Sequence, residues 1–248
     1  AVIVGFINDR IINQTCANRY TLLRTYQASD LCGNTTSCVQ TIFVNDQIPP
    51  FISCPQNLTV MCASQVPPSA PASVSTSDNC GGISTVIFEN DAISNQLCQN
   101  KYTVTRTYRA TDVCGNSATC TQIITVNDQT PPSIICPQNL TVMCASMAPL
   151  PNPASVLSSD NCGGITTILF DNDMISNQTC ANRYTITRTY RASDACGNSA
   201  TCTQLIFVND QTAPTITCPE DMTINILSDT SPASTGTASA TDNCGVLS

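Results

Sequence analysis

Cysteine is the residue type whose number and spacing could do chemistry in this chain. The 248 residues contain seventeen cysteines, and all of them follow an 82-residue period, as Cys16, Cys98 and Cys180 do. The period fails at one position, where Ile226 stands one period after Cys144. A fixed period of this length indicates tandem copies of one small module, and here each full copy carries six cysteines.

Two uses of so much cysteine compete, namely disulfides and metal binding. Zinc sites usually combine CxxC pairs with histidine, and this sequence has no CxxC pair and no histidine. Six cysteines in a module of about 80 residues are typical of proteins in oxidising compartments. We therefore expect disulfides, and an extracellular or cell-surface location.

Charge and hydropathy limit the classes of partner that the chain can have. The net charge is −8, the sequence pI is about 4.2, and the nine Lys and Arg residues are spread thinly. Nucleic-acid binding needs a clustered basic surface, so no nucleic acid is expected. No apolar run approaches the ~20 residues of a membrane span, and no membrane insertion is expected. The first ten residues do not resemble an export signal, which suggests a mature fragment or a segment of something longer.

The elements that must position the cysteines are predicted to be strands. Apolar residues alternate with polar ones over 57–62 and 102–112, and β-branched residues dominate 83–90 and 119–126. Prolines and turn residues separate these runs, and 90–100 is expected to be irregular. The fold class is therefore all-β, as tandem immunoglobulin-like sandwiches. We expect two complete modules flanked by two half-modules, at 49–130, 131–212, 1–48 and 213–248.

Four motifs give a family resemblance. CPQNLTV at 54–60, DNCGG at 78–82, YRATDVCGNSATC at 108–120 and VNDQTPP at 126–132 recur one period later with small changes. Together they resemble the hyalin-type (HYR-like) Ig-fold modules that form long arrays in giant surface proteins of Bacteroidota, including gliding adhesins exported by the type IX system. The resemblance implies an extracellular array of stalk modules, and it supplies no catalytic residue.

Strand order predicts which cysteines meet. The chain enters each module at one end, here the head end, and leaves at the other, the tail end. Cys54, Cys80, Cys114 and Cys120 should lie at the head end, and Cys62 and Cys98 at the tail end. The predicted disulfides are Cys54–Cys120, Cys62–Cys98 and Cys80–Cys114, with the copies Cys136–Cys202, Cys144–Cys180 and Cys162–Cys196. The hairpin pairing Cys114–Cys120 remains an alternative.

Five cysteines then lack a partner within the chain: Cys16, Cys32, Cys38, Cys218 and Cys244. One explanation is that the sequence is a window from a longer array. The other is that the half-modules are complementary, so that the tail of one molecule completes the head of the next, as in donor-strand assembly. The second explanation would join copies through Cys38–Cys218 and Cys32–Cys244.

Other candidate sites are weaker. Asp128, Asp160 and Asp194 should gather where two modules meet and could bind calcium, which takes six to eight oxygen ligands. The alternative is that each aspartate caps its own turn. Arg106 is expected to reach the sheet edge or to pair with a carboxylate. No serine has a histidine to activate it, so we expect no enzyme activity, and calcium is the only candidate cofactor.

The function predicted from these features is a structural repeat segment of an extracellular filament or adhesin stalk. Its expected partners are copies of the same module in an array or fibre. An alternative is an adhesive module that recognises surface glycan or protein through its loops. A further alternative is a subunit of a head-to-tail fibre built from complementary half-modules.

Overall fold

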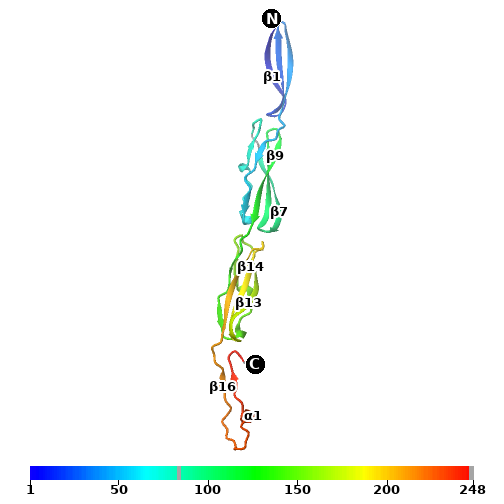
Figure 1. Ribbon diagram of the computed structural model, residues 1–248. Helices are drawn as coiled ribbons and strands as arrows, with labels where there is room; N and C mark the ends of the chain where they lie inside the picture. The colour runs from blue at the N-terminus through cyan, green and yellow to red at the C-terminus, as the bar shows by residue number, and fades with distance from the viewer. Residues whose placement is uncertain (83–84, 246–248) are drawn as a thin grey trace. The chain divides into compact units, whose positions relative to one another are not determined.

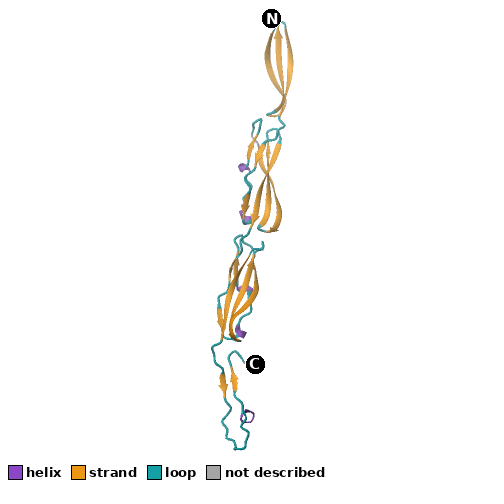
Figure 2. Ribbon diagram, in the orientation of Figure 1, coloured by secondary structure: helices purple, strands orange, loops and turns teal. Residues whose placement is uncertain are grey.

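The chain is built almost entirely of β-strands. The computed structural model describes residues 1–82 and 85–245, so the first two residues of the predicted strand 83–90 lie outside the described residues. Strands account for 54% of the residues, and Figure 2 shows them joined by loops with a few short helical turns. This confirms the predicted fold class, an all-β, disulfide-rich series of sandwich modules. The chain divides into two compact units, Ala1–Asp128 and Gln129–Ser248.

The first unit contains one three-stranded sheet and one complete module. The sheet of the N-terminal segment has the order β1-β2-β3 and is antiparallel. In the module, a two-stranded sheet β4-β6 accompanies a four-stranded sheet of order β5-β9-β8-β7, in which β5 runs parallel to β9. Figure 1 labels β7 and β9 of this sheet. The strands are β1 (Ile3–Cys16), β2 (Arg19–Ser29), β3 (Thr35–Asn45), β4 (Phe51–Ser53), β5 (Leu58–Val60), β6 (Ser75–Ser77), β7 (Thr85–Cys98), β8 (Lys101–Thr111) and β9 (Ser117–Asn127).

The second unit repeats the module and adds a short C-terminal hairpin. Its sheets are β10-β12, β11-β15-β14-β13 and β16-β17. The strands are β10 (Ser133–Ile135), β11 (Leu140–Val142), β12 (Leu157–Ser159), β13 (Thr167–Cys180), β14 (Arg183–Ser193), β15 (Ser199–Asn209), β16 (Thr215–Thr217) and β17 (Ser239–Thr241). The single α-helix in the described residues, α1 (Pro232–Thr235), lies between β16 and β17. Within these residues no helix has the length and hydropathy needed to cross a membrane.

The core of each module lies on the inner face of the two central strands. In the first module Tyr108 and Ala110 of β8, with Ile124 and Val126 of β9, are almost fully buried. The ring of Tyr108 meets that of Phe88 edge to face, with centroids 6.3 Å apart, a favoured geometry for aromatic pairs. The Tyr108 hydroxyl accepts a hydrogen bond from the Ala70 amide at 3.1 Å. This bond ties the loop between β5 and β6 to the core.

The prediction that 90–100 is irregular is wrong. β7 continues through this stretch to Cys98 and pairs with β8 along its length, with register shifts between Phe88 and Asn90 and between Ser94 and Cys98. Asn95 has a φ of 53°, a left-handed conformation that asparagine adopts more readily than most residues. Because β7 is an edge strand with much of its length exposed, polar residues there are compatible with the ladder.

The expected pairing of Arg106 with a carboxylate is confirmed. Its Nε and Nη2 donate to the two oxygens of Asp91, each at 2.8 Å, while Nη1 donates to the carbonyl oxygen of Pro67 at 2.9 Å. The side chain is only 4% exposed. A guanidinium held in this two-pronged way is among the stronger charge-assisted contacts.

Candidate functional site: the disulfide-linked module joints

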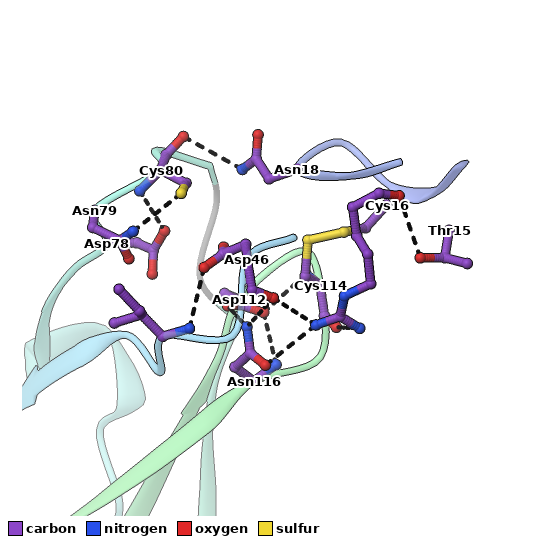
Figure 3. Close-up of a disulfide and its surroundings, with 12 residues drawn as sticks. Thr15, Cys16, Asn18, Asp46, Asp78, Asn79, Cys80, Asp112, Cys114 and Asn116 are labelled. Atoms are coloured by element: carbon purple, nitrogen blue, oxygen red, sulfur yellow. Dashed lines mark hydrogen bonds between the residues drawn. A yellow bond between two sulfur atoms is a disulfide. The ribbon is translucent and has the colours of Figure 1, made fainter. Parts of the chain in front are cut away.

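The first joint lies between the N-terminal segment and the complete module of the first unit. Cys16, at the end of β1, is bonded to Cys114, in the turn between β8 and β9, with Cα atoms 5.2 Å apart (Figure 3). The two cysteines are 98 residues apart in sequence. The bond therefore joins the tail end of one repeat to the head end of the next.

Hydrogen bonds reinforce the same joint. Arg19 donates to the carbonyl oxygens of Cys114 at 3.2 Å and Asp46 at 2.6 Å. The side-chain amide of Asn116 donates to the Asp46 carbonyl oxygen at 3.3 Å, and that of Asn18 to the Cys80 carbonyl oxygen at 3.4 Å. None of these polar residues was among the candidates predicted from the sequence. The only signal was that Asn18, Asn100 and Asn182 recur with the same period as the cysteines.

The turn that presents Cys114 is built by Asp112. Its Oδ1 accepts the backbone N–H groups of Cys114 and Asn116, both at 2.8 Å, and its Oδ2 accepts the Asn116 side-chain amide at 2.7 Å. Burial alone would raise the pKa of Asp112, but these hydrogen bonds outweigh it, and the pKa lies below its ordinary value. Asp194 has the same three contacts in its own turn. Both carboxylate oxygens of Asp194 therefore cap its own turn, which was the alternative to calcium binding there.

The second joint lies in the second unit. Cys144, just after β11, is bonded to Cys244, after β17, with Cα atoms 5.1 Å apart and a sequence separation of 100. The Asn243 side-chain amide donates to Asp210 Oδ1 at 3.3 Å across this joint. Here too, a tail-end cysteine of one repeat bonds a head-end cysteine of the next.

A different kind of disulfide lies inside each module. Cys54 is bonded to Cys120, and Cys136 to Cys202, each with a Cα separation of 5.7 Å and a sequence separation of 66. These partners are the ones that strand order predicted. Each bond ties the start of the module to the strand that ends it, β9 or β15.

Several other predicted pairings are wrong. Cys114 bonds Cys16, which excludes both Cys80–Cys114 and the alternative Cys114–Cys120. Cys144 bonds Cys244, which excludes Cys144–Cys180 and Cys32–Cys244. Cys16 and Cys244 are therefore paired, and the cysteines that remain free are all exposed: Cys32, Cys38, Cys80, Cys180 and Cys218. Cys62, Cys98, Cys162 and Cys196 are each disulfide-bonded, and Cys62–Cys98 and Cys162–Cys196 stay predictions.

The physical reason lies in where the two ends of a module meet. Strand order within one module puts Cys80 and Cys114 at the head end and Cys62 and Cys98 at the tail end, and it predicts partners within one end of the same module. At a joint, however, the tail end of one repeat contacts the head end of the next. Cys16, which occupies the position of Cys98, meets Cys114 there rather than a cysteine of its own copy.

Two carboxylates also meet at the first joint. Asp46, after β3, and Asp78, after β6, each offer an oxygen that lies within 4.8 Å of the other and of the Cys80 sulfur. Partial desolvation, together with the negative charges of Asp46 and Asp78, raises the pKa of the Cys80 thiol. Asp46 and Asp78 occupy the repeat positions of the sequence candidates Asp128 and Asp160. Asp128 is 1% exposed and its amide donates to the Asn100 carbonyl oxygen at 2.9 Å, whereas Asp160 Oδ2 accepts the Cys162 amide at 2.9 Å.

Comparison with known proteins places the chain in a family. The family described as "HYR-like domain with 4 cysteines" matches residues 50–126 and 132–208, and the chain belongs to it. Both matches fall inside the modules predicted at 49–130 and 131–212, whose boundaries stay predictions. No curated protein matches the chain.

Similar solved structures are distant. The extracellular domain of protocadherin γB4 is 16% identical with a TM-score of 0.31, over 88% of this chain and 46% of that one. Drosophila N-cadherin EC1–4 is 13% identical with a TM-score of 0.31, over 84% and 66%. The chain thus spans about half the length of the protocadherin structure. At these scores the likeness carries no argument about function.

Proposed function

We propose that the chain is a segment of an extracellular stalk in which each HYR-like module is bonded covalently to the next. The observation that carries the proposal is the disulfide across the joint in each unit, Cys16–Cys114 and Cys144–Cys244. Such a bond keeps two modules together even where the backbone between them is cut. A surface stalk exposed to proteases and to pulling would gain from that property.

The joint disulfide of the first unit, Cys16–Cys114, and that of the second unit, Cys144–Cys244, join different positions of the repeat. Moving Cys16–Cys114 forward by one period gives Cys98 with Cys196, and moving Cys144–Cys244 back by one period gives Cys62 with Cys162. Each of these four cysteines is disulfide-bonded. Our proposal is therefore that both bonds repeat with the 82-residue period, in place of Cys62–Cys98 and Cys162–Cys196.

The same pairing rule applies to the five free thiols. For each of them, the partner position that the rule gives falls outside residues 1–248. Their partners in the proposed stalk are cysteines of further modules of this kind. Cys180, for example, would pair with a cysteine at the repeat position of Cys114. Cys218 would pair with one at the repeat position of Cys120. Disulfide formation releases two protons and two electrons, which a thiol oxidoreductase of the exporting compartment would accept.

The disulfide map can be read directly. Native protein with free thiols blocked would be digested without reduction, and the linked peptides identified by mass spectrometry. We expect Cys98 linked to Cys196 and Cys62 linked to Cys162. Finding Cys62 linked to Cys98 would overturn the proposed periodic pairing, while the Cys54–Cys120 peptide serves as the internal control.

A pulling experiment tests the stalk itself. Stretched from its two ends, the oxidised chain should withhold the residues enclosed by Cys16–Cys114, a length of about 330 Å at ~3.4 Å per residue. Reductant should release that length. The double variant Cys16→Ser/Cys114→Ser should release the part of this length not enclosed by other bonds without reductant. Full extension of the oxidised parent at low force would contradict a role in resisting tension.

The cell surface is the location that the proposal requires. Six disulfides in one chain support an oxidising compartment. The sequence motifs resemble modules of Bacteroidota surface proteins, which supports a stalk within a large adhesin, of the kind exported by the type IX system for gliding. Gel migration of the native material with thiols capped, before and after reduction, would distinguish one long polypeptide from separate chains joined by disulfides.

A further inference from the structure

One pair of carboxylates at the first joint has no use in the fold described so far. Asp46 and Asp78 come from different repeats and lie beside the Cys16–Cys114 disulfide (Figure 3). Asp46 Oδ1 accepts the amide of Ile48 at 3.2 Å, and Asp78 Oδ1 accepts the amide of Cys80 at 3.0 Å. Each carboxylate thus uses one oxygen to hold its own turn.

The other oxygen of each carboxylate is buried and unbonded. Asp46 Oδ2 and Asp78 Oδ2 are both inaccessible to solvent and accept no hydrogen bond, and Asp46 as a whole is only 5% exposed. A buried polar atom without a partner costs free energy, and two carboxylates this close repel each other. The arrangement is therefore unfavourable unless a positive charge lies between them.

The nearby arginine does not supply that charge directly. Arg19 donates to the backbone carbonyls of Asp46 and Cys114 and to the Asn116 side chain, at 3.4 Å for the last. Among residues 1–82 and 85–245, the ion pairs found involve other carboxylates: Asp9, Glu89, Asp91, Asp171 and Asp173. Neither Oδ2 atom therefore has a hydrogen-bond donor or an ion-pair partner among these residues.

We propose that Asp46 and Asp78 bind a calcium ion through these two oxygens, with water completing its shell. Calcium takes six to eight oxygen ligands in flexible geometry, which suits two carboxylates whose oxygens lie within 4.8 Å of each other at a joint. A zinc site that used the Cys80 thiolate is less suitable for a repeating joint. The equivalents of Cys80, Cys162 and Cys244, are held in disulfides, so only the oxygens are common to every repeat.

A pair of aspartates at the same repeat positions also lies close together in the second unit. Asp210 and Asp242, at the positions of Asp46 and Asp78, also bring ligand oxygens within 4.8 Å of each other. Asp160, at the position of Asp78, again has a buried oxygen without a hydrogen-bond partner, Oδ1. In contrast, Asp112 spends both oxygens on its own turn. The proposed ligands are thus one aspartate from each side of the joint.

Calorimetric titration of the oxidised, chelator-treated chain with calcium chloride tests the site. We expect saturable binding, and loss of one equivalent of calcium in each of Asp46→Asn and Asp78→Asn. Cys80→Ser and the exposed control Asp221→Asn should keep full stoichiometry. Absence of saturable binding up to ~10 mM calcium, about ten times the weak limit of extracellular sites, would overturn the proposal, and so would loss of an equivalent in Cys80→Ser.

Thermal melting separates a lost ligand from a damaged fold. Calcium should raise the melting temperature of the parent chain by about 3 °C. In chelator, Asp46→Asn should melt no lower than the parent because the repulsion with Asp78 is gone, and it should respond less to calcium. A variant that melts lower in chelator yet keeps the full calcium response would show that Asp46 has a purely structural role.

Discussion

The N-terminal segment and the complete module of the first unit have the same three strands in different surroundings. β1, β2 and β3 have 14, 11 and 11 residues, and so do β7, β8 and β9. Both sheets have the same register, with Tyr26 opposite Cys38 and Tyr108 opposite Cys120. Yet Tyr108 is 1% exposed, whereas Tyr26 remains half-buried.

The difference comes from the strands that cover the sheet. Residues 49–80 add β5 along β9 and place β4 against β8 and β9, while residues 1–48 contain only the three strands. Both sheets keep the same register, and full burial of the tyrosine accompanies the strands of residues 49–80. Positions one period apart then form natural pairs of a test variant and its control.

The largest expected difference is at the centre of the core. Ile124 is fully buried and pairs with Leu58 of β5, so Ile124→Ala should lower the free energy of unfolding by ~3–4 kcal/mol. Ile42→Ala, one period earlier on a half-covered face, should cost about 1 kcal/mol or less. Hydrogen exchange resolved by peptide would measure opening of β8–β9 and β2–β3 separately. Equal costs at the two positions would contradict the comparison.

A smaller difference is expected at the arginine that bridges strands and loop. Arg106 is 4% exposed and contacts both Asp91 and the Pro67 carbonyl, whereas Arg24 is 34% exposed and contacts Asp9. Arg106→Met should cost about 2 kcal/mol because it leaves a part-buried carboxylate and a carbonyl unpaired. Arg24→Met should cost clearly less, because the Arg24–Asp9 pair is more exposed to solvent. Urea unfolding in low and high salt would check this, since only the Arg24 pair should weaken clearly with salt.

The fold followed closely from the sequence because its signals are local. Alternation at 102–112 places Tyr108 inside, β-branched residues predict the strand at 119–126, and the turn residues of 113–117 separate the two strands. The stretch 90–100 was mispredicted since polar residues on an exposed edge strand look like a loop. Only its pairing with β8 reveals the strand.

The joints could be predicted only in part. A strict repeat makes Cys16 and Cys98 equivalent, so spacing alone cannot tell a partner in the same copy from one in the next. Cys54–Cys120 was accessible because strand order brings the two together within one module. Cys16–Cys114 was not, because it depends on how the end of one repeat meets the start of another. The Asp46–Asp78 pair was foreseen only as a gathering of carboxylates at Asp128, Asp160 and Asp194.

A still smaller effect is expected at the tyrosine hydroxyl. Tyr108→Phe keeps the ring but leaves the Ala70 amide without its acceptor, at a cost of about 1–2 kcal/mol. Tyr26→Phe should be nearly neutral, since residues 1–48 contain no counterpart of the loop that carries Ala70. Hydrogen exchange at residues 66–74 is the specific readout. Unchanged protection of this loop in Tyr108→Phe would show that the hydroxyl does not hold it.

The smallest expected difference is in how far two equivalent turns, each capped by an aspartate, loosen at low pH. Asp112 and Asp30 both have a pKa below 3.8, Asp112 because hydrogen bonds from its turn outweigh its burial, Asp30 mainly because of the Asn34 side chain. A folded pKa below the unfolded one stabilises the protein above the unfolded value, and this contribution is lost as the pH falls through the folded pKa. Both turns should thus loosen only in strong acid. The Asp112 turn should loosen less because the Cys16–Cys114 bond holds it, whereas Cys32 in the Asp30 turn is free.

Carboxyl and side-chain amide signals in NMR between pH 5 and 2, with Asp112→Asn and Asp30→Asn as references, would measure the loosening of both turns. Equal loosening would mean that the joint disulfide does not constrain the turn.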